Sequence, residues 1–132
     1  MFGMKCEELL MTYLYIQVLE NKFIIQVLDN NESREIFLPE KNFTTKRLLV
    51  GNFSAAQDCL SKAIKRLVPK KLFTRKTAAV VMHPMEMYEG GLSEVEERIL
   101  NELAFSSGAI KVALHTGATL TAKEAKHKIN DL

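Results

Sequence analysis

The sequence predicts an α/β domain built on a mixed five-stranded sheet, with its elements in the order βββαβαβ and helices on the faces of the sheet. Three runs rich in β-branched and aromatic residues lie between Tyr13 and Leu38, separated by short polar turns, which is the pattern of an antiparallel meander. Two further apolar runs each follow a helical pattern, and a helix between two strands favours a crossover to a parallel neighbour. With 132 residues and no internal repeat, the chain is expected to form a single domain, residues 1–132.

The predicted meander consists of Tyr13–Leu19, Phe23–Leu28 and Arg34–Leu38. Between the first two strands, Glu20-Asn21-Lys22 is expected to form a hairpin turn. Leu48–Gly51 fits either a short edge strand or a packed loop.

The first helix is predicted from Ser54 to about Val68. Ser54 followed by Gln57 has the spacing of a capping box, in which the Ser hydroxyl and the later side chain satisfy free backbone amides. Pro69 stops the helix, because proline lacks the amide that the helix needs. The apolar positions recur at helical spacing and are expected to face the core: Ala56, Cys59, Leu60, Ala63, Ile64 and Leu67.

The second crossover is the clearest stretch of the chain. Thr77–Met82 is a short apolar run typical of a strand covered on both faces, and His83-Pro84 is expected to end it. Ser93-Glu94-Val95-Glu96 forms a capping box, Gly108 is the expected residue after the helix, and Ile110–Leu114 is the next strand. The predicted core face of this helix comprises Val95, Ile99, Leu100, Leu103 and Ala104.

A last short helix is predicted through Ile129. Thr121 and Glu124 have capping-box spacing, and Ala122, Ala125 and Ile129 are expected to face inward. The lead-in, Met1 to Met11, has room for one helical turn around Cys6–Leu10.

The run AAVVMHP, followed by LSEVEERILNELAFSSGAIKVAL, resembles a segment of the bacterial actin-like proteins of the MreB, rod shape-determining type. The resemblance covers about a quarter to a third of the chain. Two features depart from that family: the loop Met85–Gly91 is longer, and His115-Thr116 stands where the family has Glu-Pro. A generic βαβ unit with a capped helix would share part of the pattern. The matching positions are Pro84, Ser93, Val95, Glu96, Arg98, Gly108, Ala109 and Val112.

This resemblance implies a ribonuclease H-like fold, which is the core of the actin-like ATPase subdomains. Such ATPases hold phosphate with an Asp-x-Gly-Thr hairpin between the first two strands, where glycine lets backbone amides approach the phosphate oxygens. The corresponding residues here, Leu19–Phe23, contain no glycine, and Glu20 would repel phosphate unless a metal intervened. We therefore expect no ATP site, no cofactor and no enzymatic activity.

A ribonuclease H-like nuclease is the alternative. Its chemistry needs several carboxylates that converge on two metal ions. Neither Tyr13–Leu19 nor Thr77–Met82 carries an Asp or Glu, and Asp58 and Glu20 lie on a predicted helix and a turn. A nucleic-acid-binding protein that uses residues 62–76 belongs to the same alternative.

Charge is distributed asymmetrically. Residues 41–76 hold ten Lys and Arg against one Asp, a net charge of +9, whereas residues 86–102 hold six acids and one Arg, a net charge of −5. The basic residues from Lys62 to Lys76 suit an acidic protein surface, nucleic acid or an anionic membrane surface, although Phe73 is the one aromatic residue among residues 62–76. A solvated helix face that packs against the acidic helix of the same or a neighbouring copy explains the same pattern. The candidate interaction residues are Lys62, Lys65, Arg66, Lys70, Lys71, Arg75 and Lys76.

Met85, Met87 and Tyr88 lie in the long loop after the predicted strand. Methionine-rich loops provide adaptable contact surfaces, and the same side chains could instead fold back over the sheet edge. Together with the resemblance, these residues predict a non-catalytic MreB-like subdomain. It would act through contacts with a protein partner, or through self-association, in a bacterial cytoskeletal or cell-shape assembly.

The remaining signals are weak. The two cysteines, Cys6 and Cys59, have no metal-binding spacing, and Cys59 is expected to be a buried reduced thiol. The three histidines, His83, His115 and His127, have no metal-ligand spacing, so no metal is expected. His83 follows a strand, where α/β sheets place functional groups, but a histidine there is more often a loop residue. No apolar run approaches the ~20 residues of a membrane span and no secretory signal is evident, so a cytoplasmic location is expected.

Overall fold

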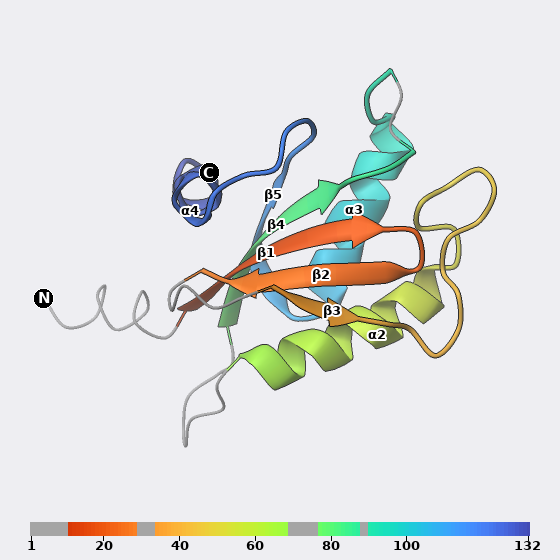
Figure 1. The fold of residues 1–132 in the computed structure, drawn as a ribbon, viewed down its shortest axis with the longest axis horizontal. Coiled ribbons are helices and arrows are strands. Elements are labelled where there is room, and N and C mark those ends of the chain that lie inside the picture. The colour runs from red at the N-terminus through yellow and green to blue at the C-terminus, as the bar shows by residue number, and fades with distance from the viewer. Residues whose placement is uncertain (1–10, 29–33, 69–76, 88–89) are drawn as a thin grey trace, which may run out of the picture.

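The computed structural model describes residues 11–28, 34–68, 77–87 and 90–132, and it is an α/β fold with a five-stranded mixed sheet. Its elements follow the predicted order, and a helix closes the described part of the chain (Figure 1). The elements are β1 Met11–Leu19, β2 Lys22–Val27, β3 Glu35–Phe37, α2 Phe53–Leu67, β4 Thr77–Pro84, α3 Glu94–Ser106, β5 Ala109–Leu114 and α4 Ala122–Asn130.

The strands lie in the order β3-β2-β1-β4-β5. β1 pairs antiparallel with β2, and β2 with β3, which confirms the predicted meander. β4 pairs parallel with both β1 and β5, which confirms the two crossovers. The ladder between β1 and β4 runs from Met11 opposite Thr77 to Val18 opposite Pro84, so these two strands form the centre of the sheet.

Helices cover both faces of the sheet: α2 and α3 lie on one face and α4 on the other (Figure 1). Successive side chains of a strand point to opposite faces, so β1 contributes Leu14 and Ile16 to the α2–α3 side and Tyr15 to the α4 side. On the second face, Ala125 and Ile129 of α4 are fully buried. The inward-facing residues predicted for this last helix are therefore confirmed.

The start of α2 differs from the prediction. Asn52, not Ser54, is the N-cap residue, and its side-chain oxygen accepts a hydrogen bond from the Ala55 amide at 3.3 Å. Ser54 instead donates its hydroxyl proton to the same oxygen at 3.2 Å. Asn is among the strongest N-caps, so the capping residue lies two positions earlier than the Ser–Gln spacing indicated. The capping boxes at Ser93 and Thr121 are confirmed, and Gly108 follows α3 with a φ of 124°.

β4 ends at Pro84, as His83-Pro84 indicated, but these two residues belong to the strand, which is therefore two residues longer than the predicted Thr77–Met82. The amide of Met85 donates to the carbonyl of Val18 at 2.9 Å, which shows that alternate amides of β4 point toward β1. The missing amide of Pro84 therefore points toward β5. Because β5 pairs only as far as Leu114 opposite Met82, no ladder bond is lost there.

Val95 is the one predicted core residue of α3 that lies outside, with 65% of its surface exposed. It lies about 80° around the helix from Leu103, whose side chain is fully buried, and this angle is enough to leave the apolar stripe. Residues 48–51 form a packed loop rather than a strand, with Leu49 and Val50 buried. No helix in the described ranges combines the length and apolar character needed to cross a bilayer.

Leu60 tests the main core. Its side chain is completely buried between α2 and the sheet, so Leu60→Ala is expected to lower the free energy of unfolding by about 2–5 kcal/mol. Lys65→Ala on the exposed side of the same helix should change it by less than about 0.5 kcal/mol. Urea unfolding followed by circular dichroism measures both. Equal effects of the two substitutions would contradict this packing.

Candidate functional site

The hairpin turn between β1 and β2 contains Glu20 and Asn21, the residues in which the sequence predicts no phosphate site. The Glu20 amide donates to the Glu86 carboxylate at 2.8 Å, and the Asn21 amide donates to the Thr44 hydroxyl at 2.9 Å. A phosphate site built from a turn needs its backbone amides free to point at the ligand. In this turn, side chains of the same chain already occupy both amides.

Asn21 fastens this hairpin to the loop before α2. It adopts a φ of 52°, which Asn tolerates better than most residues, and so it replaces the glycine that such a turn often needs. Its side-chain oxygen accepts hydrogen bonds from the amides of Phe43 and Thr44, both at 2.8 Å. Phe43 in turn stacks on Phe23 with ring centroids 4.9 Å apart. The turn is therefore rigidly held in a form that is closed to an anion.

A shallow hollow open to solvent lies beside this hairpin. Side chains from the loop before α2, the end of β4 and the first turns of α3 line it, and we call it the Met87 hollow. Two charged residues, Glu86 and Glu96, also line it. Its apolar lining includes Leu48, Val50, Pro84, Met87, Leu92 and Ile99.

The two methionines predicted as contact residues have different surroundings. Met87 is exposed, adopts a φ of 57° and lines the hollow. Met85 is half-buried and its sulfur accepts a hydrogen bond from the Gln17 side chain at 3.5 Å. Met87 thus remains a candidate contact residue, whereas Met85 folds back onto the sheet, the alternative that the sequence left open. Tyr88 lies outside the described residues.

The hollow has negative charge around it. One oxygen of Glu86 accepts the Glu20 amide, and one oxygen of Glu96 accepts the Ser93 amide at 3.0 Å in the capping box. Both bonds fix the carboxylates in place without neutralising them. Glu94 and Glu97 in the first turn of α3 add to this charge. The hollow therefore favours an apolar group attached to a cation.

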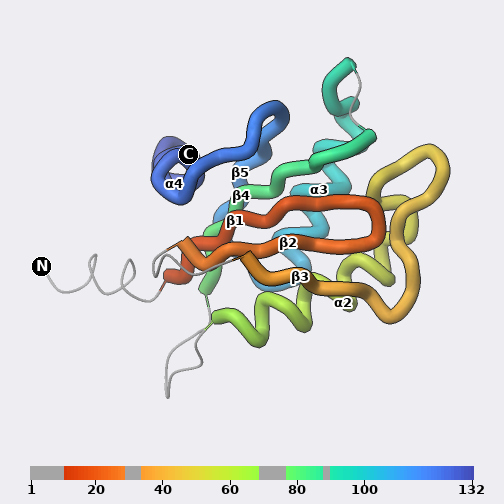
Figure 2. The backbone as a smooth tube through the Cα atoms, in the orientation of Figure 1, coloured from red at the N-terminus to blue at the C-terminus, as the bar shows by residue number. Residues whose placement is uncertain are grey.

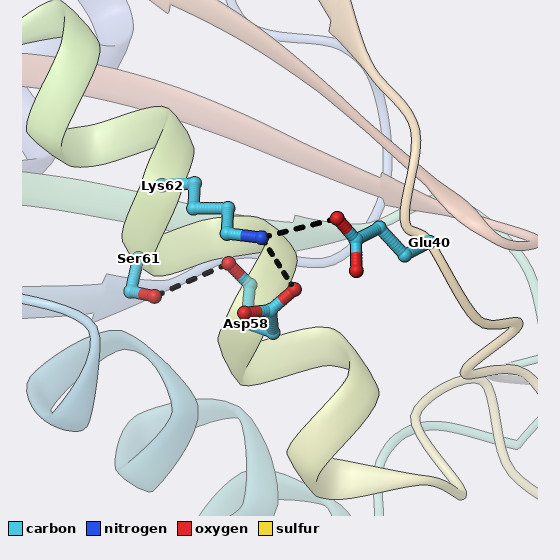
Figure 3. A network of polar contacts seen from close by, with 4 residues as sticks. All are labelled: Glu40, Asp58, Ser61 and Lys62. Carbon is cyan, nitrogen blue, oxygen red and sulfur yellow. Dashed lines mark hydrogen bonds and ion pairs between the residues drawn. The ribbon is translucent and has the colours of Figure 1, made fainter.

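The basic residues of α2 that the structure describes, Lys62, Lys65 and Arg66, are all exposed. Lys62 pairs with Asp58 at 3.1 Å and with Glu40 at 3.3 Å, and Ser61 bonds the Asp58 carbonyl beside them (Figure 3). Hydrogen bonds to Asp58 and Glu40 raise the pKa of Lys62. The described basic face is thus partly neutralised by neighbouring acids.

Arg66 pairs with Glu35 of β3, and its guanidinium lies over the Phe37 ring, 5.4 Å from the centroid. Exposed ion pairs of this kind contribute at most about 1 kcal/mol each, so a binding partner could displace them at low cost. The other predicted basic residues, Lys70, Lys71, Arg75 and Lys76, lie outside the described residues.

The carboxylates considered for a nuclease do not come together. Asp58 lies on α2, which covers one face of the sheet, whereas His83 faces the α4 side with Tyr15. Glu20 lies in the hairpin turn and its amide contacts Glu86. In the described part of the chain, no group of three or more His, Cys, Asp or Glu residues is placed to hold a metal ion.

His83 is a buried structural residue and not an exposed loop residue. Its Nδ1 lies 2.6 Å from the Tyr15 hydroxyl, and its Nε2 lies 3.0 Å from the Gly117 carbonyl oxygen. The carbonyl can only accept, so Nε2 carries the proton and Nδ1 accepts from Tyr15. The Leu120 amide donates to the Tyr15 oxygen at 3.0 Å. A neutral His83 thereby ties β1 and β4 to the loop that leads into α4.

The surroundings of His83 disfavour its charged form. Burial lowers the pKa of His83, and the charges of His115 and Lys128 lower it further, while the hydrogen bond to Gly117 opposes them. The His115 ring lies edge-on against it, with centroids 4.6 Å apart. Burial likewise raises the pKa of Tyr15. No local signal in the sequence indicates this network, because its members are separated by up to 105 positions.

Cys59 is buried, as predicted. Burial, with the nearby Asp58 carboxylate, raises the pKa of its thiol to about 11. The thiolate is the reactive form, so this cysteine is not suited to nucleophilic chemistry.

The His83 network makes stability depend on pH. The unfolded chain takes up a proton on this histidine near pH 6.5, whereas the folded chain does so only at lower pH. Below pH 6.5 the unfolded state therefore binds more protons, and the free energy of unfolding is expected to fall by up to about 1.4 kcal/mol per pH unit. Urea unfolding between pH 8 and pH 5 measures this slope.

His83→Gln, which stays neutral, should be less stable at pH 8 and should lose this part of the slope. His127→Gln is the matched control, because His127 lies on the surface of α4. If His83→Gln and the wild type show the same slope, the buried neutral His83 is not its source.

The sequence is similar to that of a protein from Escherichia coli. It is 34% identical over 105 residues to the uncharacterized protein YjaA of Escherichia coli (strain K12), and the match covers 76% of this chain and 80% of that protein. No protein-family model matches the sequence.

Proposed function

The chain belongs to the family of the E. coli protein YjaA, and we propose that it is a non-catalytic, MreB-like domain that acts through protein–protein contacts. Such a domain would work in the cytoplasm, in a bacterial cytoskeletal or cell-shape assembly. The proposal rests on the fold, on the closed hairpin turn and on the Met87 hollow.

The fold supports an actin-related, ribonuclease H-like core. A meander of β3, β2 and β1 is followed by two crossovers that add β4 and β5 in parallel. α2 and α3 share one face, and α4 covers the other (Figure 1). This arrangement agrees with the one implied by the resemblance to MreB-type proteins, beyond the segment in which the residues match.

The closed hairpin turn is the observation that carries the non-catalytic part of the proposal. Phosphate would have to displace the Glu86 carboxylate from the Glu20 amide and the Thr44 hydroxyl from the Asn21 amide. It would also meet the negative charges of Glu20 and Glu86 at the same place. Binding ATP here would therefore break satisfied hydrogen bonds and bring like charges together.

The Met87 hollow supports the contact part of the proposal. It combines apolar side chains with two fixed carboxylates, Glu86 and Glu96, on elements held by the sheet. A flexible methionine adapts to differently shaped side chains, and complementary charge selects the partner. The described basic residues of α2 support a nucleic-acid role less well, because the carboxylates beside Lys62 and Arg66 would also lie close to the phosphates and repel them.

Magnesium ATP tests this proposal directly. Titration of magnesium ATP into the purified chain is expected to release no saturable heat, because both turn amides are occupied. A thermal unfolding scan with and without magnesium ATP is the independent check, since a ligand that binds the folded state raises the unfolding temperature. Saturable binding with a micromolar Kd, accompanied by such a rise, would overturn the non-catalytic assignment.

A further inference from the structure

We propose that the Met87 hollow docks the basic segment 69–76 of a second copy of this chain, in a head-to-tail contact. This inference rests on the proposed function and names its partner.

The hollow defines what it can accept. It is shallow, and its apolar lining from Pro84, Met87 and Ile99 offers a contact surface for an apolar side chain rather than a deep cavity. Glu86 and Glu96 bring negative charge to the same surface, and none of the described residues that line it is Lys or Arg. A suitable occupant is therefore an apolar residue with Lys or Arg on both sides, since the apolar group anchors and the charges steer.

The chain itself contains such a sequence. Residues 69–76 read Pro-Lys-Lys-Leu-Phe-Thr-Arg-Lys, in which Leu72 and Phe73 have two cations before them and two after them. These residues lie outside the part that the structure describes, so the argument uses only their sequence and the described residues on either side of them. Their charge is opposite to that of residues 86–102, which carry a net −5.

The backbone of the segment does not reach the Pro84 side of the hollow in its own molecule. It is attached at Val68 and Thr77, at the start of β4, whereas the hollow is lined by Pro84 at the end of β4. The seven steps from Thr77 to Pro84 span about 23 Å. The backbone at Leu72 or Phe73 reaches only about 14 Å from its anchors, even when fully extended. Figure 2 shows the end of α2 and the end of β4 at opposite ends of the sheet.

The contact therefore joins two different surfaces of two molecules. Such a heterologous contact leaves one hollow and one basic segment unused in every pair, so association continues into rings or open chains. Because the attraction between exposed charges is screened, association should weaken as the salt concentration rises.

The test uses two variants, each of which damages one surface. Met87→Lys places a cation in the hollow. Because Met87 is exposed and does not belong to the core, this variant is expected to fold. Lys70→Glu/Lys71→Glu reverses the charge before Leu72. The matched controls carry the same charge changes elsewhere: Val95→Lys on the exposed side of α3, and Lys111→Glu/Lys123→Glu on exposed positions of β5 and α4.

Sedimentation equilibrium over a concentration series measures association, and circular dichroism confirms that each variant is folded. The wild type is expected to grow in mass with concentration at about 0.1 M salt and to associate at least tenfold more weakly at about 1 M, where the screening length falls to about 3 Å. Each damaged variant alone should associate at least tenfold more weakly than the wild type. Both controls should behave as the wild type does.

The mixture of the two damaged variants is decisive. The intact segment of Met87→Lys fits the intact hollow of Lys70→Glu/Lys71→Glu, so an equimolar mixture should form pairs with one molecule of each and nothing larger. Absence of these pairs, or damaged variants that associate as the wild type does, would overturn the docking proposal. A wild type that stays monomeric would also overturn it but leave the proposed function intact, whereas saturable ATP binding would remove the proposed function whatever the mass.

Discussion

The parallel ladder between β1 and β4 is the constraint on which the rest of the molecule depends. It pairs Met11–Val18 with Thr77–Pro84, and both strands are buried on both faces. A buried two-faced strand needs a cover on each side, which α2 and α3 provide on one face and α4 on the other. The ladder also fixes the ends of these strands. The hairpin turn after β1 and the Met87 hollow after β4 therefore lie side by side at the same edge of the sheet.

The contacts at this edge occupy the backbone amides of the hairpin turn between β1 and β2. Asn21, Thr44 and Glu86 come from three separate segments, and each satisfies a backbone group that a ligand would otherwise use. Such bonds contribute about 1 kcal/mol each, but a buried amide left unsatisfied costs more. The turn is therefore more stable with its amides bonded to these side chains than with the amides left free. The neighbouring surface, where Met87 is exposed above Pro84, keeps the apolar character that a contact needs.

Much of the fold could be predicted because its signals are local. The helical spacing of Leu60, Ala63 and Ile64, and the capping boxes at Ser93 and Thr121, depend on residues a few positions apart. The features that could not be predicted depend on distant partners or on register. Pro84 remains in β4 because β5 stops two residues earlier, and Asn52 replaces Ser54 as the cap because the preceding loop is held by Phe43.

The candidate site divides in the same way. Met87 could be selected from the sequence, since a methionine-rich loop after a strand is a local signal. The occupied amides of Glu20 and Asn21 could not, because their partners, Glu86 and Thr44, are 66 and 23 positions away. His83 shows the same limit: a histidine next to a proline resembles a loop residue until Tyr15 and Gly117 are placed around it.

The β1–β4 ladder also sets the distance between the regions of opposite charge. The chain as a whole carries only +2, which by itself would suggest a nearly neutral surface. However, β4 separates the end of α2 from the acidic end of the sheet by about 23 Å, whereas charges are screened beyond about 8 Å at physiological ionic strength. Charges at the end of α2 therefore do not neutralise the carboxylates of the Met87 hollow. A net charge close to zero is therefore compatible with two regions of opposite charge, which is the condition that the proposed contact between molecules needs.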